Sequence, residues 1–157
     1  MRIINPQAPV DGRQSETALM VARGVRRMLR GHGFSSVTEL GLLSGRRADI
    51  VALHPDGTVH IVEIKSSIAD FRADQKWRDY RAHCDRLYFA IPETVPPEII
   101  PGEAGLILAD AYGAHLVREA AEHRMPPATR RAVLLRFAMT AADRMHGLSD
   151  PGVPDAS

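Results

Sequence analysis

A β-hairpin in the middle of the sequence limits the possible folds more than any other feature. Two apolar segments, residues 48–54 and 58–66, are joined by Pro55-Asp56-Gly57. Proline pre-sets the backbone of the first turn residue, and glycine accepts the left-handed conformation that closes a three-residue loop. The pattern therefore predicts two adjacent antiparallel strands in which Asp49 lies opposite Glu63.

This register brings three charged side chains to one face of the hairpin. Side chains alternate along a strand, so Glu63 and Lys65 share a face, and Asp49 faces them from the neighbouring strand. Two carboxylates in such a pair lie about 5 Å apart and repel each other. A positive group should therefore compensate them, and Lys65 and a divalent cation are both candidates. An ordinary cross-strand charge cluster on a surface hairpin is the plainer alternative.

The lysine at this place is unusual for the chain. Of 20 basic residues only Lys65 and Lys76 are lysines, and the rest are arginines. A compact ammonium differs physically from a planar guanidinium, so the few lysines are candidates for work that arginine does badly. The segment Ile61-Val62-Glu63-Ile64-Lys65 is otherwise apolar, and buried charges are normally paired or bound to metal.

Oxygen ligands on rigid strands suit Mg²⁺, or Mn²⁺ in its place. With an ammonium beside them, they fit metal-assisted hydrolysis of a phosphodiester. The metal would activate a water and neutralise the phosphate, while the ammonium would orient that water or stabilise transition-state charge. His54 and His60 have no third ligand at convincing spacing, so we do not expect a zinc site.

The remaining segments predict an α/β protein with one mixed sheet between helices. A helix over residues 15–30 has an apolar stripe, and its opposite face carries Glu16 and several arginines, for which a solvated face is favoured over DNA binding. The other predicted elements are strands at 37–43, 86–91, 105–109 and 115–118, a helix at 69–84, and a last helix after Pro126-Pro127.

Length and composition set the outer limits. The 157 residues fit one domain, which we place at 15–146, between a flexible arm at 1–14 and a flexible tail at 147–157. A single cysteine excludes an internal disulfide and a cysteine-rich zinc module. We find no membrane-length apolar run and no signal core, so we expect a cytoplasmic protein. A net charge of +1 neither demands nor forbids nucleic acid.

At the hairpin the sequence resembles the PD-(D/E)XK nuclease superfamily. Its restriction-endonuclease-like core is a helix, a three-stranded meander, a second helix and a further strand, with Asp on strand two and (D/E)-x-Lys on strand three. Asp49 and Glu63-Ile64-Lys65 occupy those positions, while Arg47-Ala48 replaces the Pro that can precede the Asp. More narrowly, six blocks resemble the MmcB family of DNA repair proteins. They are GRRAD at 45–49, IVEIKSS at 61–67, DFRAD at 70–74, KWRDY at 76–80, CDRLYFA at 84–90 and GLILAD at 105–110.

The resemblance implies bacterial DNA repair and DNA as the partner. It implies Asp49, Glu63 and Lys65 as catalytic residues. The implied metal ligands are Asp49, Glu63, Ile64 and a further glutamate. The family's first helix suggests Glu16 for that glutamate, and the strand beside Asp49 offers Glu39, which is slightly preferred. A solvated structural role is the alternative for either one. Arg46 and Arg47, just before Asp49, and Arg72 and Lys76, on the helix that follows, are the expected contacts to DNA phosphates.

Two functions stay open at this point. The chain is a Mg²⁺-dependent or Mn²⁺-dependent DNA endonuclease, or it is a non-catalytic DNA-binding or adaptor protein of the same fold. Repair-protein partners and the oligomeric state, a homodimer included, are left open. A kinase or dehydrogenase has no support, because GxxxxGK[ST] and GxGxxG are both missing.

Overall fold

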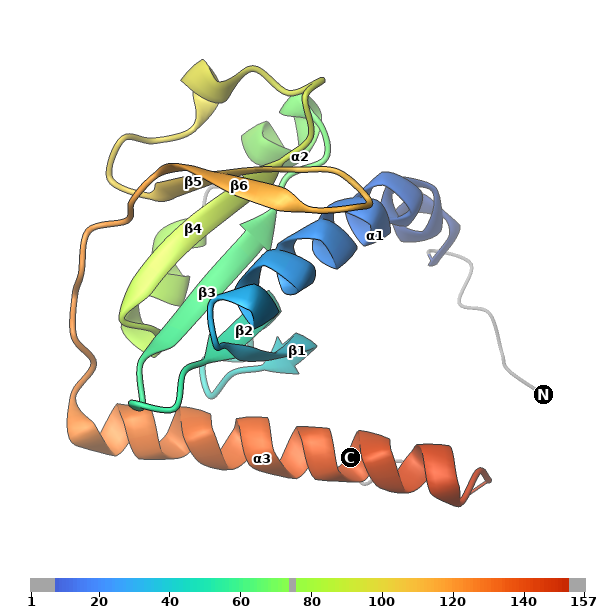
Figure 1. Cartoon of the computed structure of the whole chain (residues 1–157), viewed down its shortest axis with the longest axis vertical. Coiled ribbons are helices and arrows are strands. Elements are labelled where there is room, and N and C mark those ends of the chain that lie inside the picture. Colours follow the sequence, from blue (N-terminus) through green and yellow to red (C-terminus); the bar gives the residue numbers. More distant parts are fainter. Residues whose placement is uncertain (1–7, 74–75, 153–157) are drawn as a thin grey trace.

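One six-stranded mixed sheet forms the centre of the molecule, in the order β1-β2-β3-β4-β5-β6 (Figure 1). The structure is a computed structural model that describes residues 8–73 and 76–152. Strands β1 to β3 form an antiparallel meander, β3, β4 and β5 are parallel neighbours, and β6 is antiparallel to β5. The strands are β1 (Ser35–Gly41), β2 (Arg47–Leu53), β3 (Val59–Ile64), β4 (Arg86–Ile91), β5 (Gly105–Ala109) and β6 (Ala114–Arg118).

Helices cover the sheet on both faces. The helical elements are α1 (Ala8–Gly31), α2 (Ile68–Ala73), the 3-10 helices η1 (Trp77–His83) and η2 (Pro97–Ile99), and α3 (Pro127–Ser149). Val21, Val25 and Leu29 of α1 pack on one face of the sheet, in a core cluster with Ile50 and Val62. Trp77 of η1 and Val133 of α3 belong to the cluster on the other face. Because both faces are covered, β3 is apolar on both sides, as its sequence predicted.

The predicted hairpin register is confirmed. Ile50 pairs with Val62 and Leu53 with Val59, which places Asp49 opposite Glu63. Val51 and Ile61, two residues away from the charged positions on their strands, lie in the α3-side core cluster. Alternation therefore directs Asp49, Glu63 and Lys65 toward this face as well.

The predicted helix over residues 69–84 is wrong, because two separate elements take its place. Helix α2 ends at Ala73, and the 3-10 helix η1 begins at Trp77. Phe71 and Trp77 both pack edge-on against Phe89, with ring centroids 5.6 and 5.5 Å away. In one continuous α-helix these two side chains would point about 120° apart, so a single helix would not bring both to the same ring.

The ends of the chain are more helical than the sequence predicted. Helix α1 begins at Ala8, so residues 8–14, which we expected in the arm, are part of it. Helix α3 runs to Ser149 and takes in the first residues of the expected tail. Residues 1–7 and 153–157 lie outside the described part of the chain, and the arm and tail predictions stay untested there.

Candidate functional site

Asp49 and Glu63 hold each other in place across the β2–β3 pair. The main-chain N–H of Asp49 donates to Oε1 of Glu63 over 3.1 Å. The N–H of Ile64 donates to Oδ2 of Asp49 over 2.8 Å. Each carboxylate is thus oriented by an N–H group of the opposite strand, and its second oxygen takes no part in that bond.

The two carboxyl groups resist losing both their protons. Burial raises the pKa of Glu63 well above its usual range, and the neighbouring Asp49 raises it further. Burial also raises the pKa of Asp49, although the Ile64 N–H and the Lys65 charge act in the opposite direction. Like charges this close cannot both ionise cheaply. The pair therefore tends to share a proton unless a cation replaces it.

Lys65 is buried at the same site, with 7% of its surface exposed. Its positive charge lowers the pKa of both Asp49 and Glu63. Its main-chain N–H donates to the carbonyl of Ala90, which continues the β3–β4 pairing past Ile64. An ammonium buried beside two carboxyl groups matches the predicted arrangement.

A local hydrogen-bond network fixes the chain directly after Lys65. Asp70 accepts hydrogen bonds from the N–H and the hydroxyl of Ser66, at 3.2 and 2.6 Å. The hydroxyl of Ser67 in turn accepts from the N–H of Asp70 over 3.1 Å. This reciprocal pattern at the start of α2 is close to a capping box. Its signal, Ser67-x-x-Asp70, lies in the sequence, but our sequence reasoning did not use it.

Glu39 lies across from Asp49 on the other neighbouring strand, since the pairs Thr38–Ile50 and Leu40–Ala48 flank it. Its charge contributes to the raised pKa of Asp49. Its side chain is 64% exposed, however, and Arg47 lies 4.0 Å away. Glu39 also has a left-handed backbone, with φ of 50°, and its carbonyl accepts a hydrogen bond from Arg144 of α3. Glu16, the alternative, is an exposed residue of α1, the helix on the opposite face of the sheet.

The arginines just before Asp49 already have acidic partners. Arg46 forms an ion pair with Asp79 at 3.1 Å, and Arg47 faces Glu39. Arg72 on α2 and Lys76, which precedes η1, are both exposed. The predicted single helix face with Arg72 one turn before Lys76 does not exist, because α2 and η1 are separate. Tyr80 of η1 donates to the carbonyl of Arg47 over 3.2 Å and so joins η1 to the start of β2.

The donors present suit a hard divalent cation better than zinc. No group of three His, Cys, Asp or Glu side chains within residues 8–73 and 76–152 is arranged to hold a metal. Mg²⁺ does not need such a group, because one or two carboxylates, waters and substrate oxygens are its usual ligands. Asp49 and Glu63 can provide the carboxylates. Ile64 can offer only its main-chain carbonyl.

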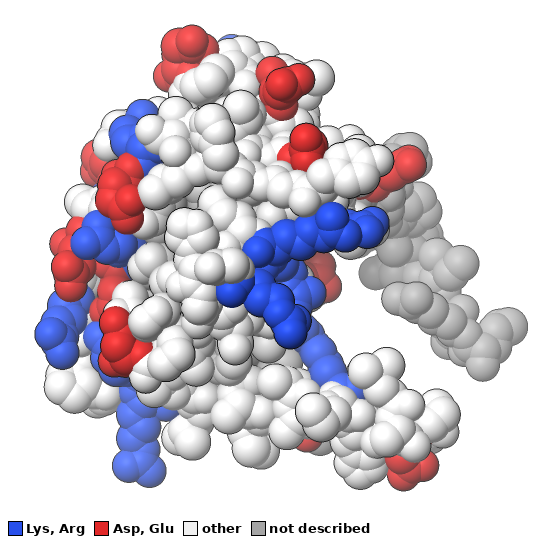
Figure 2. Space-filling model, in the orientation of Figure 1, with Lys and Arg blue, Asp and Glu red and all other residues white. Residues whose placement is uncertain are grey.

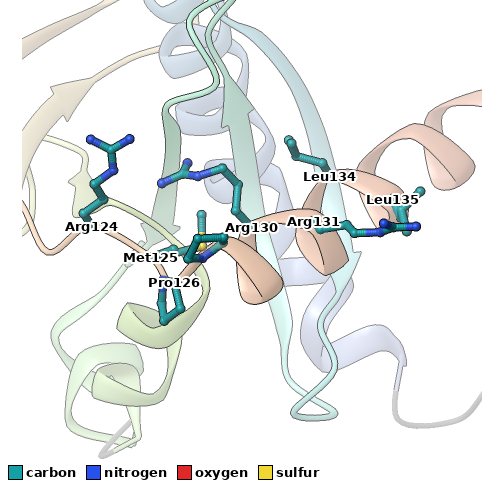
Figure 3. Close-up of a pocket in the computed structure, with 8 residues that line it drawn as sticks. Arg124, Met125, Pro126, Arg130, Arg131, Leu134 and Leu135 are labelled. Atoms are coloured by element: carbon teal, nitrogen blue, oxygen red, sulfur yellow. The ribbon is translucent and has the colours of Figure 1, made fainter.

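A cavity of about 790 Å³ opens elsewhere, at the start of α3 (Figure 3). It is lined by Arg124, Arg130 and Leu134 among others, and by none of the predicted site residues. Arg130 is already bound to Asp85 through two 2.7 Å hydrogen bonds. This hollow is therefore separate from the carboxylate pair, and Arg130 in its lining is already paired with Asp85.

Two solved structures are similar to this chain, to very different degrees. A solved structure from Silicibacter pomeroyi, described as SPO1766 protein of unknown function, is 45% identical, with a TM-score of 0.84 over 87% of this chain and 93% of that one. A repair endonuclease from Pyrococcus abyssi is 13% identical and covers 62% of this chain and 42% of that one. Its TM-score of 0.31 is too low to support an argument.

A search of curated proteins finds no match. In the described part of the chain, no helix has the length and apolar character needed to cross a membrane. The family model of the DNA repair protein MmcB-like family matches residues 5–152. The chain belongs to the MmcB-like family of DNA repair proteins.

Proposed function

We propose that this chain is a Mg²⁺-dependent or Mn²⁺-dependent deoxyribonuclease that hydrolyses DNA phosphodiester bonds during repair. The observation that carries the proposal is the convergence of Asp49 and Glu63 from paired strands, with Lys65 buried beside them. Burying these charged groups is unfavourable, because carboxylates are normally excluded from a protein core unless they are paired. A function at this place would explain why the chain carries them.

Asp49 and Glu63 are the proposed metal ligands, with the Ile64 carbonyl and Glu39 as further candidates. A divalent cation bound there would neutralise the phosphate and activate a water. Lys65 would hold that water or stabilise the extra negative charge of the transition state. The main-chain donors at Asp49 and Ile64 keep the two carboxylates in position before any ligand arrives.

A non-catalytic DNA-binding or adaptor protein is the second candidate. One observation favours it: Glu63 and Lys65 are only 3% and 7% exposed, while the more accessible Glu39 lies beside Arg47. Under this alternative the three charges serve to hold β2 and β3 together, and their loss changes stability more than DNA binding.

Cleavage of single-stranded, duplex, flap and junction DNA with Mn²⁺ separates the two functions. The proteins are wild type, Asp49→Asn, Glu63→Gln and Lys65→Ala. We expect each variant to lose about 100-fold or more in rate, because each removes a group that acts on the reacting phosphate. Glu98→Gln is the matched control, since Glu98 of η2 is an exposed carboxylate and is not one of the predicted site residues.

Equal cutting by wild type and Asp49→Asn would exclude this site as the source of activity. The adaptor would be supported by two results together. The wild type would bind Mn²⁺ but cut no DNA, and Lys65→Ala would keep the DNA affinity of the wild type. Metal binding is measured directly by calorimetry, with wild type and Glu63→Gln compared.

A further inference from the structure

Four arginines line one groove on the opposite side of the sheet from the carboxylate pair. Arg23, Arg26, Arg27 and Arg30 are all exposed on α1, and with Ser35, Ser36 and Thr38 of β1 they border a hollow of about 750 Å³. Figure 2 shows basic side chains gathered over the position of α1 in Figure 1. Their spacing of three, four and seven residues places them on one helix face.

These arginines lack acidic partners within the described residues. Arg26 donates to the hydroxyl and carbonyl of Ser36, and Arg27 reaches the carbonyl of Tyr112. No carboxylate of the described part pairs with any of the four, whereas Arg46, Arg47, Arg78 and Arg86 all have one. Like charges three or four residues apart destabilise a helix by about 0.2–0.5 kcal/mol per pair. An external anion would remove that cost.

We propose that this arginine groove binds the phosphate backbone of duplex DNA. Arg23 and Arg30 are seven residues apart, which is about 10 Å along the helix axis. For a helix that lies along the duplex axis, that length matches roughly three phosphate-to-phosphate steps of one strand, at about 3.4 Å of rise each. Arginine is well suited to such contacts because its planar donors match phosphate oxygens.

Duplex DNA fits this groove better than a single strand does. Single-strand sites combine positive charge with aromatic rings on which bases stack. Phe34 is the one aromatic residue in the described lining, and its ring already packs against His54 and His60, at 5.1 and 4.7 Å between centroids. The groove thus offers contacts to backbone and no open stacking platform.

The edge strand β1 borders both the groove and the candidate site. Thr38, which lines the groove, directly precedes Glu39, which lies opposite Asp49 in the β1–β2 pair. DNA whose scissile phosphate lies at Asp49 and Glu63 could therefore extend past β1 onto α1. This inference rests on the proposed function only in taking DNA as the ligand, and it does not require cleavage.

Duplex binding measured by fluorescence anisotropy in EDTA tests the groove without catalysis. The test variant is Arg23→Ala/Arg30→Ala, because neither side chain forms a hydrogen bond or an ion pair within the described residues. The control is Arg124→Ala/Arg131→Ala, which removes the same charge near the start of α3. We expect about tenfold weaker binding for the test variant and a change of less than about twofold for the control. The slope of log K against log salt should fall by about 0.9 for each lost phosphate contact.

Arg23→Lys/Arg30→Lys should recover most of the affinity, because it restores the charge. Equal binding by test and control variants, no binding by the wild type, or tighter binding of a single strand than of duplex would each overturn the proposal. A groove variant that binds normally while Asp49→Asn loses cleavage would refute the groove alone. Loss of binding in the groove variant, with no cleavage by any protein, would refute the nuclease alone.

Discussion

At the scale of single residues, Glu63 is the group of the candidate site whose protonation folding perturbs most strongly. It is almost fully buried, it lies beside Asp49, and its Oε1 accepts a hydrogen bond from the Asp49 main chain. Its raised pKa means that the folded protein holds a proton that the unfolded chain releases near pH 4.5. In the absence of metal this group therefore opposes folding more strongly as the pH rises above 4.5.

We predict that Glu63→Gln stabilises the metal-free protein at pH 7. The amide keeps the shape of the side chain and removes a charge whose burial is unfavourable, and a difference of one in pKa between folded and unfolded protein corresponds to about 1.4 kcal/mol. Urea unfolding in EDTA at pH 5 and pH 7 measures the effect, which should grow with pH. A variant that is less stable than wild type at both pH values would contradict this account of the pair.

The same proton makes metal binding depend on pH. A metal ligand must be deprotonated, so cation binding at Asp49 and Glu63 should release protons. We predict that Mn²⁺ affinity in wild type rises with pH above the ordinary glutamate value of 4.5, and that Glu63→Gln loses most of this dependence. Calorimetry in two buffers with different ionisation enthalpies counts the protons. Affinity that is independent of pH in wild type would count against the shared proton.

At the scale of elements, strands were predicted better than helices. The predicted strands at 86–91 and 105–109 have the same first and last residues as the observed strands. Apolar runs bounded by turn residues leave little choice of where a strand begins and ends. The hairpin register followed from Pro55-Asp56-Gly57. The prediction of one helix at 69–84 was wrong because helical spacing is a local pattern. It does not indicate that Phe71 and Trp77 both pack against Phe89, which is distant in the sequence.

The site was predictable only where strand alternation controls it. Asp49, Glu63 and Lys65 converge as expected, since alternation and register place them. The left-handed backbone at Glu39 and the acidic partners of Arg46 and Arg47 depend on contacts between distant segments. No local sequence pattern encodes those contacts, and the contact from Arg144 to the Glu39 carbonyl joins residues that are 105 positions apart in the sequence.

Asp85 joins three elements, and its loss should be costly. Burial alone would raise the pKa of Asp85, but hydrogen bonds from Arg130 and from the N–H groups of Val59 and Met125 hold it at about 2. We predict that Asp85→Ala destabilises the fold by about 3–5 kcal/mol, as expected when a buried pair loses one partner. Asp79→Ala, which removes an exposed pair, should cost less than about 1 kcal/mol. Urea unfolding compares them, and equal costs would contradict this role for Asp85.

Gly24 sets the distance between α1 and the β5–β6 turn. A Cβ added at Gly24 would lie 2.0 Å from the Asp110 carbonyl oxygen and 2.4 Å from that of Gly113. We predict that Gly24→Ala destabilises the protein by about 2 kcal/mol or more, because main-chain atoms must move. Gly147→Ala in α3, where a Cβ meets nothing within 4 Å, should instead stabilise by up to about 1 kcal/mol. Thermal unfolding of both variants checks the sign of each effect.

At the scale of the whole molecule, the sheet separates two surfaces of different character. The carboxylate pair lies on the side of α3 and η1, and the arginine groove lies on the side of α1, with β1 as the edge between them. Overall charge is nearly balanced at +1, so it is the distribution of charge, and not its sum, that distinguishes the side proposed to bind metal from the side proposed to bind DNA phosphates.

Buried and partly buried groups on both sides of the sheet couple global stability to pH with opposite signs. His60, whose ring lies between Phe34 and Tyr88, has a pKa lowered to about 4, first by burial and then by the Arg86 charge. The unfolded chain takes up this proton near pH 6.5, so the contribution of His60 to stability is lost as the pH falls from 6.5 toward 4. Asp49 and Glu63 act in the reverse sense over an overlapping range.

A difference measurement isolates the histidine from the carboxyl pair. We predict that wild type loses stability relative to His60→Leu as the pH falls from 7 to 4, by a few kcal/mol in total, since a pKa difference of one is about 1.4 kcal/mol. The carboxyl pair is the same in both proteins and cancels in the difference. Urea unfolding in EDTA at half-unit intervals of pH provides the data. A difference in unfolding free energy that stays constant from pH 7 to pH 4 would show that the partly buried ring takes up its proton in the folded protein as readily as in the unfolded chain.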